Sequence, residues 1–189
     1  MKEKQTKIDW VIEQHDRTNH FYDEYLPYSF HLRMVVRAYE DWKDLLDDTE
    51  PFYKFSDTAI TERAACYFAA FGHDLIEDTR TSYNDVKSNL GQEAADIIFA
   101  VSNEKGKSRK ERANEKYYEG IRNTKGAVFV KLCDRIANVQ YGKLTKSRMF
   151  EMYKKENPLF IESLGFVSGE AHRFGKMVLY LEKLFSNES

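Results

Sequence analysis

Residues 128–139, VFVKLCDRIANV, are the stretch of the chain that decides the fold. The stretch is strongly apolar, and we interpret it as a helix of the protein core. It nevertheless carries Asp134, and a carboxylate is costly to bury unless something positive compensates its charge. We therefore expect a core helix that brings an acidic side chain to a functional site.

Working outward, the helical pattern recurs along the rest of the chain. Apolar residues follow helical spacing within residues 8–15, 31–45, 60–71 and 174–185. No run of alternating polar and apolar residues is long enough to predict a strand. The sequence thus predicts an all-α fold of roughly eight to ten helices, with at most a short hairpin.

Local signals predict where some of these helices begin and end. Ser108 and Glu111 have the spacing of a capping box, which predicts a helix that starts near residue 109. Ser82 and Asp85 carry a weaker version of the same signal. The three prolines, Pro27, Pro51 and Pro158, are expected at boundaries, because proline breaks helical hydrogen bonding.

Length, charge and cysteine content limit the class of protein. The 189 residues predict one domain, 1–189, and 42% of them are hydrophobic, which is enough for a core. A net charge of −2 excludes a polycationic nucleic-acid coat, so no nucleic-acid partner is expected. No apolar run approaches the length of a membrane span, and the first ten residues do not have the apolar region of a secretory signal. The two cysteines, Cys66 and Cys133, form no CxxC motif, which excludes a thiolate zinc site and fits a cytoplasmic location.

Four residues form a candidate set of metal ligands: His31 in PYSFHLR, His73 and Asp74 in GHDLIEDT, and Asp134. Taken alone, a histidine on an apolar face is more often a hydrogen-bonded core residue, and Asp134 beside Arg135 could be a plain ion pair. Taken together on a helical background, the four favour a metal site. Imidazole and carboxylate ligands suit Mn, Fe, Zn or Mg.

The order of these residues resembles the HD superfamily of metal-dependent phosphohydrolases. PYxxH before His31, HDxxEDT at 73–79 and KLCDRIANV at 131–139 resemble more closely the hydrolase domain of the alarmone synthetase–hydrolases and the small alarmone hydrolases. The resemblance covers about residues 10–145 and leaves 146–189 as a helical C-terminal extension. It implies removal of the 3′-pyrophosphate from guanosine tetra- or pentaphosphate, with Mn²⁺ as the metal.

The resemblance also implies roles for single residues. His31, His73, Asp74 and Asp134 match the metal ligands, and Glu77 and Asp78 match the acidic pair that handles the attacking water. Asn138 matches an asparagine that contacts the ribose or a phosphate of the substrate. Asp134 and Asn138 are four residues apart, so on a helix they share a face.

Other substrate contacts are candidates from residue type. An Arg-Lys pair that packs on guanine in the family is absent from 20–31, HFYDEYLPYSFH, where Tyr22 or Phe21 could stack on the base instead. The basic run that contains Lys105, Lys107 and Arg109 is a candidate phosphate clamp. Lys131 and Arg135 either hold phosphates or neutralise Asp134.

Three functions stay open on the sequence alone. The first is hydrolysis of the alarmone nucleotides. The second is an HD phosphohydrolase, a nucleotidase or a phosphodiesterase, that acts on another nucleotide, and the missing Arg-Lys pair favours it. The third is a non-catalytic module that binds a nucleotide, although every expected ligand and both acids are present.

Overall fold

A computed structural model describes residues 6–54, 60–103, 106–166 and 172–186 of the chain. Within these ranges the chain forms nine α-helices of eight or more residues and two of four residues. The α-helices are α1 (Lys7–Asp16), α2 (Ser29–Trp42), α3 (Glu62–Gly72), α4 (Leu75–Asp78), α5 (Tyr83–Leu90), α6 (Gln92–Val101), α7 (Arg109–Arg112), α8 (Glu115–Asn123), α9 (Ala127–Thr145), α10 (Arg148–Ser163) and α11 (Gly175–Phe185). The predicted all-α fold is confirmed.

The remaining regular structure in the described ranges is small. A two-stranded antiparallel hairpin pairs β1 (Phe21–Tyr22) with β2 (Leu26–Pro27), so the sheet content stays within the predicted short hairpin. A single 3₁₀ turn, η1 (Lys43–Leu45), follows α2. No helix of the described chain is long and apolar enough to cross a membrane.

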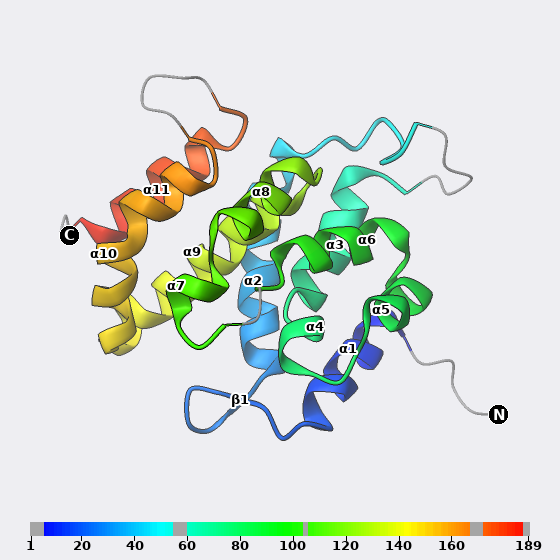
Figure 1. Ribbon diagram of the computed structural model, residues 1–189, viewed down its shortest axis with the longest axis horizontal. Coiled ribbons are helices and arrows are strands. Elements are labelled where there is room, and N and C mark those ends of the chain that lie inside the picture. Colours follow the sequence, from blue (N-terminus) through cyan, green and yellow to red (C-terminus); the bar gives the residue numbers. More distant parts are fainter. Residues whose placement is uncertain (1–5, 55–59, 104–105, 167–171, 187–189) are drawn as a thin grey trace.

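Helix α9 is the centre of the packing. It contacts α2, α3, α6, α8, α10 and α11, and it runs through the middle of the molecule in Figure 1. Its side chains Phe129, Leu132 and Ile136 are almost fully buried. Because six helices surround it, a polar side chain on α9 must find its partners inside the protein.

Two helix starts confirm the capping signals in the sequence. Ser82 caps α5 with a full capping box to Asp85. Ser108 Oγ accepts a hydrogen bond from the backbone N–H of Glu111 at 3.2 Å, as predicted, but the helix that follows, α7, has only four residues. A box of this kind defines the first turn and does not ensure that a helix continues.

Pro158 is where the prediction of a boundary is wrong, because α10 continues through it to Ser163. A proline inside a helix removes one backbone hydrogen bond and costs about 3 kcal/mol. The helix tolerates this cost because its inner face packs on α9, where Asn157 and Phe160 are buried on either side of the proline. Tertiary packing here outweighs a local signal.

Candidate metal centre

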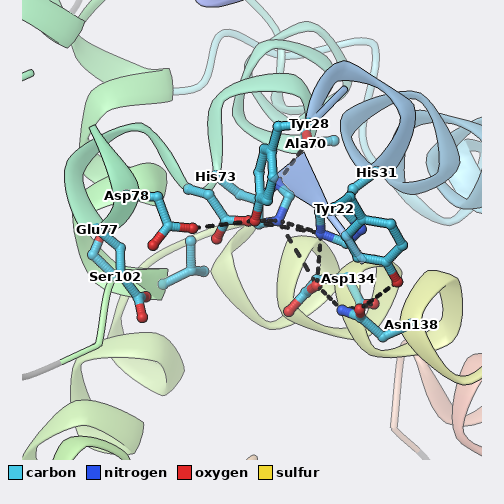
Figure 2. A network of polar contacts seen from close by, with 12 residues as sticks. Tyr22, Tyr28, His31, Ala70, His73, Glu77, Asp78, Ser102, Asp134 and Asn138 are labelled. Atoms are coloured by element: carbon cyan, nitrogen blue, oxygen red, sulfur yellow. Dashed lines mark hydrogen bonds and ion pairs between the residues drawn. The ribbon is translucent and has the colours of Figure 1, made fainter. Parts of the chain in front are cut away.

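The predicted metal ligands come from the start of α2, the connection between α3 and α4, and the interior of α9. His31 lies in the first turn of α2, and His73 and Asp74 form the sharp connection between α3 and α4. A Cβ atom at Gly72 would lie 2.9 Å from Ile98 Cδ1 and 3.0 Å from Leu75 Cδ1, so a larger residue there would displace these side chains. Asp134 comes from the third turn of α9. Figure 2 shows the side chains of His31, His73 and Asp134 converging.

The ligand atoms of His31, His73 and Asp74 all lie within 4.8 Å of one another. The two Nε2 atoms are 3.2 Å apart, and His73 Nε2 is 2.9 Å from Asp74 Oδ2. Asp134 Oδ1 lies 3.5 Å from His31 Nε2 and 3.7 Å from His73 Nε2. The sequence prediction that these four side chains come together is therefore matched by the geometry.

The chemistry of this cluster fits a divalent metal ion. His73 Nδ1 lies 3.0 Å from the carbonyl oxygen of Ala70, which orients Nδ1–H outward and leaves the Nε2 lone pair facing the cluster. Metal-binding histidines are usually oriented in this way. Two inward-facing imidazole nitrogens beside two carboxylates form a hard-to-borderline donor set without thiolate. The residues present thus suit Mn²⁺, Fe²⁺, Zn²⁺ or Mg²⁺ alike.

The electrostatics of the cluster also favour a cation. Burial opposes protonation of His73, but the carboxylates of Asp74 and Asp134 outweigh it and raise the pKa of His73 to about 9. Burial alone would raise the pKa of Asp134, but Lys131 and both histidines hold it well below its usual range. Lys131 Nζ donates to Asp134 Oδ2 at 3.2 Å. The two carboxylates thus place negative charge beside the imidazole nitrogens, where a bound metal ion would take the place of the proton on His73.

Helix α4 carries both predicted acids, on one side of the cluster (Figure 2). Asp78 Oδ2 accepts a hydrogen bond from the Tyr28 hydroxyl at 3.2 Å, and burial together with Asp74 and Glu77 raises the pKa of Asp78 to about 7. The Glu77 carboxylate accepts hydrogen bonds from the Asn103 side chain at 2.8 and 2.9 Å. The two acids therefore have different surroundings, Asp78 half-buried and Glu77 near the surface.

A cavity of about 870 Å³ opens onto the cluster. Its wall contains His31, Asp74 and Asp134 from the metal cluster, both acids of α4, and the cations Arg112, Lys131 and Arg135. The carboxylates of Asp74 and Asp134 lie at the metal cluster, and the lining cations come from α7 (Arg112) and α9 (Lys131 and Arg135). This arrangement suits a phosphate-bearing ligand that reaches from the metal cluster toward the cations.

Some of the predicted substrate contacts line the cavity and others do not. Tyr22, Asn138, Lys131 and Arg135 all line the cavity. Among the described residues Lys107 is exposed and does not line the wall, and its backbone N–H donates to Glu111. Lys105 and the side chain of Arg109 lie outside the described residues. Arg112, which follows these residues in α7, does line the cavity.

Arg135 has partners that the sequence did not indicate. Its guanidinium lies over the rings of Phe160 and Tyr153, at 4.1 and 4.6 Å from their centroids, and 3.6 Å from Glu156 Oε2. All three partners belong to α10. Arg135 therefore joins α10 to the helix that carries Asp134.

Two further residues of the site were missed from sequence. Tyr28 lines the cavity and donates its hydroxyl to Asp74 and to Asp78. Asn103 binds Glu77 through its side chain and its backbone N–H. Tyr28 precedes His31 by three residues, so helical spacing was a usable signal for it. Asn103 follows α6 in a polar stretch and carries no such signal.

Comparison with known proteins confirms the resemblance found in the motifs. No family model matches the chain. Curated relatives are the guanosine-3′,5′-bis(diphosphate) 3′-pyrophosphohydrolases MESH1 of Xenopus tropicalis, 28% identical over 85 residues, and of Danio rerio, 24% identical over 133 residues. The matches cover 45% and 70% of this chain. They span 44% and 65% of the relatives, less than two thirds of either.

The fold is similar over almost the whole chain. A solved structure described as a metazoan orthologue of SpoT that hydrolyses ppGpp superposes with a TM-score of 0.64, at 17% sequence identity. The superposition covers 98% of this chain and 97% of that one. The chain thus has the helical HD-domain fold, and the superposition extends beyond residue 145, into the segment predicted as a helical C-terminal extension.

Proposed function

We propose that the protein is a metal-dependent nucleotide pyrophosphohydrolase that removes the 3′-pyrophosphate from guanosine tetraphosphate or pentaphosphate. The observation that carries the proposal is the convergence of His31, His73, Asp74 and Asp134 at one end of a cavity with cations along its wall. The similarity to the MESH1 hydrolases, whose name states this activity, supports the choice of substrate.

The proposed reaction consists of attack by water, cleavage of a P–O bond and protonation of the leaving oxygen. A water oxygen bonds to the phosphorus attached to the ribose 3′ oxygen, the bond from that phosphorus to the 3′ oxygen breaks, and the 3′ oxygen takes up a proton. A divalent ion, held by the two histidines and two aspartates, would neutralise phosphoryl charge and acidify the water. Mn²⁺ is the proposed metal.

Glu77 and Asp78 are the groups for proton transfer in this proposal. Both line the cavity, and both lie within one helical turn of His73 and Asp74. One would take a proton from the attacking water and the other would supply the proton for the 3′ oxygen. Lys131 and Arg112 would hold phosphate oxygens, because both cations line the cavity and Lys131 Nζ lies 3.2 Å from Asp134 Oδ2.

A second function is favoured by one observation. Tyr22 occupies the region where the family has an Arg-Lys pair, and the family's cationic contact to guanine has no counterpart in residues 20–31. The base could therefore differ from guanine, in which case the protein would be a phosphohydrolase of another nucleotide.

A nucleotide panel tests the proposal. Mn²⁺-loaded protein is incubated with guanosine tetraphosphate, adenosine tetraphosphate, nucleoside monophosphates and cyclic dinucleotides, and products are separated by ion-exchange chromatography. We expect pyrophosphate and guanosine diphosphate from the first compound, and none from the Asp134→Ala variant. Turnover of a monophosphate or cyclic dinucleotide alone supports the second function. No turnover of any compound overturns both and favours a binding module.

A further inference from the structure

Tyr22 contacts His31 with its ring and Asn138 with its hydroxyl. It is in β1 of the hairpin, a segment that lies outside the helical core, and its side chain reaches into the cavity wall. Figure 2 places its ring beside His31 and its hydroxyl beside Asn138. His31 belongs to α2 and Asn138 to α9, so one side chain contacts both helices that carry metal ligands.

The hydroxyl of Tyr22 begins a chain of hydrogen bonds to Asp134. It donates to Asn138 Oδ1 at 3.0 Å, and Asn138 Nδ2 donates to Asp134 Oδ1 at 2.5 Å. Asn138 Nδ2 also lies 3.1 Å from the backbone oxygen of Asp134. Both ends of the Asn138 amide are thus engaged, and Tyr22 fixes which end faces Asp134.

The ring of Tyr22 supports the other helix. It lies parallel to the ring of His31, with an interplanar angle of 7° and centroids 4.7 Å apart. The hairpin that carries Tyr22 is tied to α9 by a second contact, because the Tyr141 hydroxyl donates to Asp23 at 2.8 Å. The Tyr22 ring is thus held over His31 by the hydrogen bond of its hydroxyl to Asn138, and the hairpin that carries it is held by Asp23.

We infer that Tyr22 is a positioning residue that sets His31 by stacking and Asp134 through Asn138, so that two metal ligands from separate helices meet in one geometry. The inference rests on the proposed function, since it presumes that these residues bind a divalent metal. Groups that orient metal ligands in this way typically change metal affinity by about 10- to 100-fold when removed. Tyr22 acts on the ligands and need not touch the substrate to do so.

The test measures Mn²⁺ affinity by the electron paramagnetic resonance signal of free Mn²⁺, without substrate. Tyr22→Phe keeps the ring over His31 and removes the hydroxyl, whereas Tyr22→Leu removes both. Tyr25→Phe and Tyr25→Leu are matched controls, because Tyr25 is in the same hairpin and 81% exposed. We expect about 10-fold weaker binding for Tyr22→Phe, a larger loss for Tyr22→Leu, and no change for either control.

A double variant separates the hydrogen-bond chain from a general loss of structure. If Tyr22 acts on Asp134 through Asn138, then adding Tyr22→Phe to Asn138→Ala weakens Mn²⁺ binding no further than Asn138→Ala alone. Tyr22→Phe is expected to fold, because it removes only one oxygen atom. Unchanged affinity in Tyr22→Phe and Tyr22→Leu, with a native protein that binds Mn²⁺, overturns this inference alone. A native protein that binds no Mn²⁺ overturns the proposed metal site as well.

Discussion

At the scale of single residues, the site is defined by how buried charges are compensated. Asp74 and Asp134 are largely buried beside two histidines, and an isolated carboxylate in such a place would neutralise itself by taking up a proton. Here Asp134 accepts hydrogen bonds from Lys131 and Asn138, and Asp74 lies 2.9 Å from His73 Nε2. These contacts keep both carboxylates ionised and available to a metal ion.

The two acids of α4 give the first prediction. Glu77→Gln and Asp78→Asn should each keep the metal and the fold but lower turnover of guanosine tetraphosphate by about 10²-fold or more, the usual scale for a group that transfers a proton. Steady-state rates and metal content are measured together. Glu119→Gln, on the exposed face of α8, is the control and should leave both unchanged. Near-native rates in one of the two variants would remove that residue from the mechanism.

His15 gives a prediction about pH. It is fully buried against the ring of Tyr28, and neither ring nitrogen has a hydrogen-bond partner among the residues that the structure describes. Burial lowers its pKa to about 4, against the opposing attraction of Asp74 and with smaller contributions from the other histidines nearby. The unfolded chain takes up a proton near pH 6.5, which the folded protein takes up only near pH 4. The free energy of unfolding should therefore fall as pH drops through this window, by about 3 kcal/mol from His15.

The comparison that isolates this effect uses His15→Phe, which keeps an aromatic ring over Tyr28. Urea unfolding is followed at pH 7 and pH 4.5 with a chelator present, so that metal binding does not contribute. The native protein should lose more stability between the two pH values than the variant does. Equal losses would show that His15 is not a source of acid sensitivity.

At the scale of elements, the sequence predicts helices well where a stripe of apolar residues meets a capping signal. The stripe at 60–71 and the Ser82 capping box correspond to α3 and α5. The sequence predicts helices and strands less well where packing between distant segments determines their ends or their position. α10 continues through Pro158 because Phe160 is buried, and the hairpin at 21–27 is held by contacts from Tyr22 and Tyr141 to residues more than 100 positions away.

Gly126 lies where the start of α9 packs closely against Cys66 of α3 and Ile97 of α6. It precedes α9 with φ +82°, and a Cβ atom there would lie 2.7 Å from Cys66 Sγ and 3.0 Å from Ile97 Cδ1. Gly126→Ala should therefore destabilise the protein by about 3 kcal/mol, from backbone strain and steric overlap together. Gly120→Ala is the matched control, because Gly120 is within α8 and nothing lies within 4 Å of its Cβ position. It should be neutral or stabilise by about 0.5 kcal/mol. Chemical denaturation measures both, and equal effects would contradict the packing argument.

At the scale of the whole molecule, the site exists only when distant segments are brought together. The motif spacing was enough to predict that His31, His73, Asp74 and Asp134 meet, because each lies in a recognisable pattern. The partners that orient them were less accessible. The contacts from Tyr22 to Asn138, from Asn103 to Glu77 and from Arg135 to Phe160 join residues 116, 26 and 25 positions apart, and no local pattern encodes such pairs.

The start of α11 is attached to the rest of the fold by an ion pair in which the Glu62 carboxylate is buried and the Arg173 side chain is 42% exposed. Glu62, at the beginning of α3 and 1% exposed, accepts hydrogen bonds from both terminal nitrogens of Arg173, at 3.0 and 2.8 Å, and from the backbone N–H of Asp47. The Arg173 Nε donates to the carbonyl oxygen of Leu45 at 2.6 Å. One arginine thus joins the segment before α11 to both η1 and α3.

Arg173→Leu should therefore lower the free energy of unfolding by about 3 kcal/mol, because it leaves the Glu62 carboxylate buried without its counter-charge. Arg37→Leu is the control: the pair of Arg37 with Asp41 is exposed, and such pairs contribute less than about 1 kcal/mol. Adding Glu62→Gln to Arg173→Leu should restore part of the loss, since a neutral amide costs less to bury than an unpaired carboxylate. If Arg173→Leu were no more harmful than Arg37→Leu, the ion pair would not be what attaches α11. The restoration by Glu62→Gln is the decisive result, because a variant that had merely lost packing at Arg173 would not regain stability when a second native side chain is replaced.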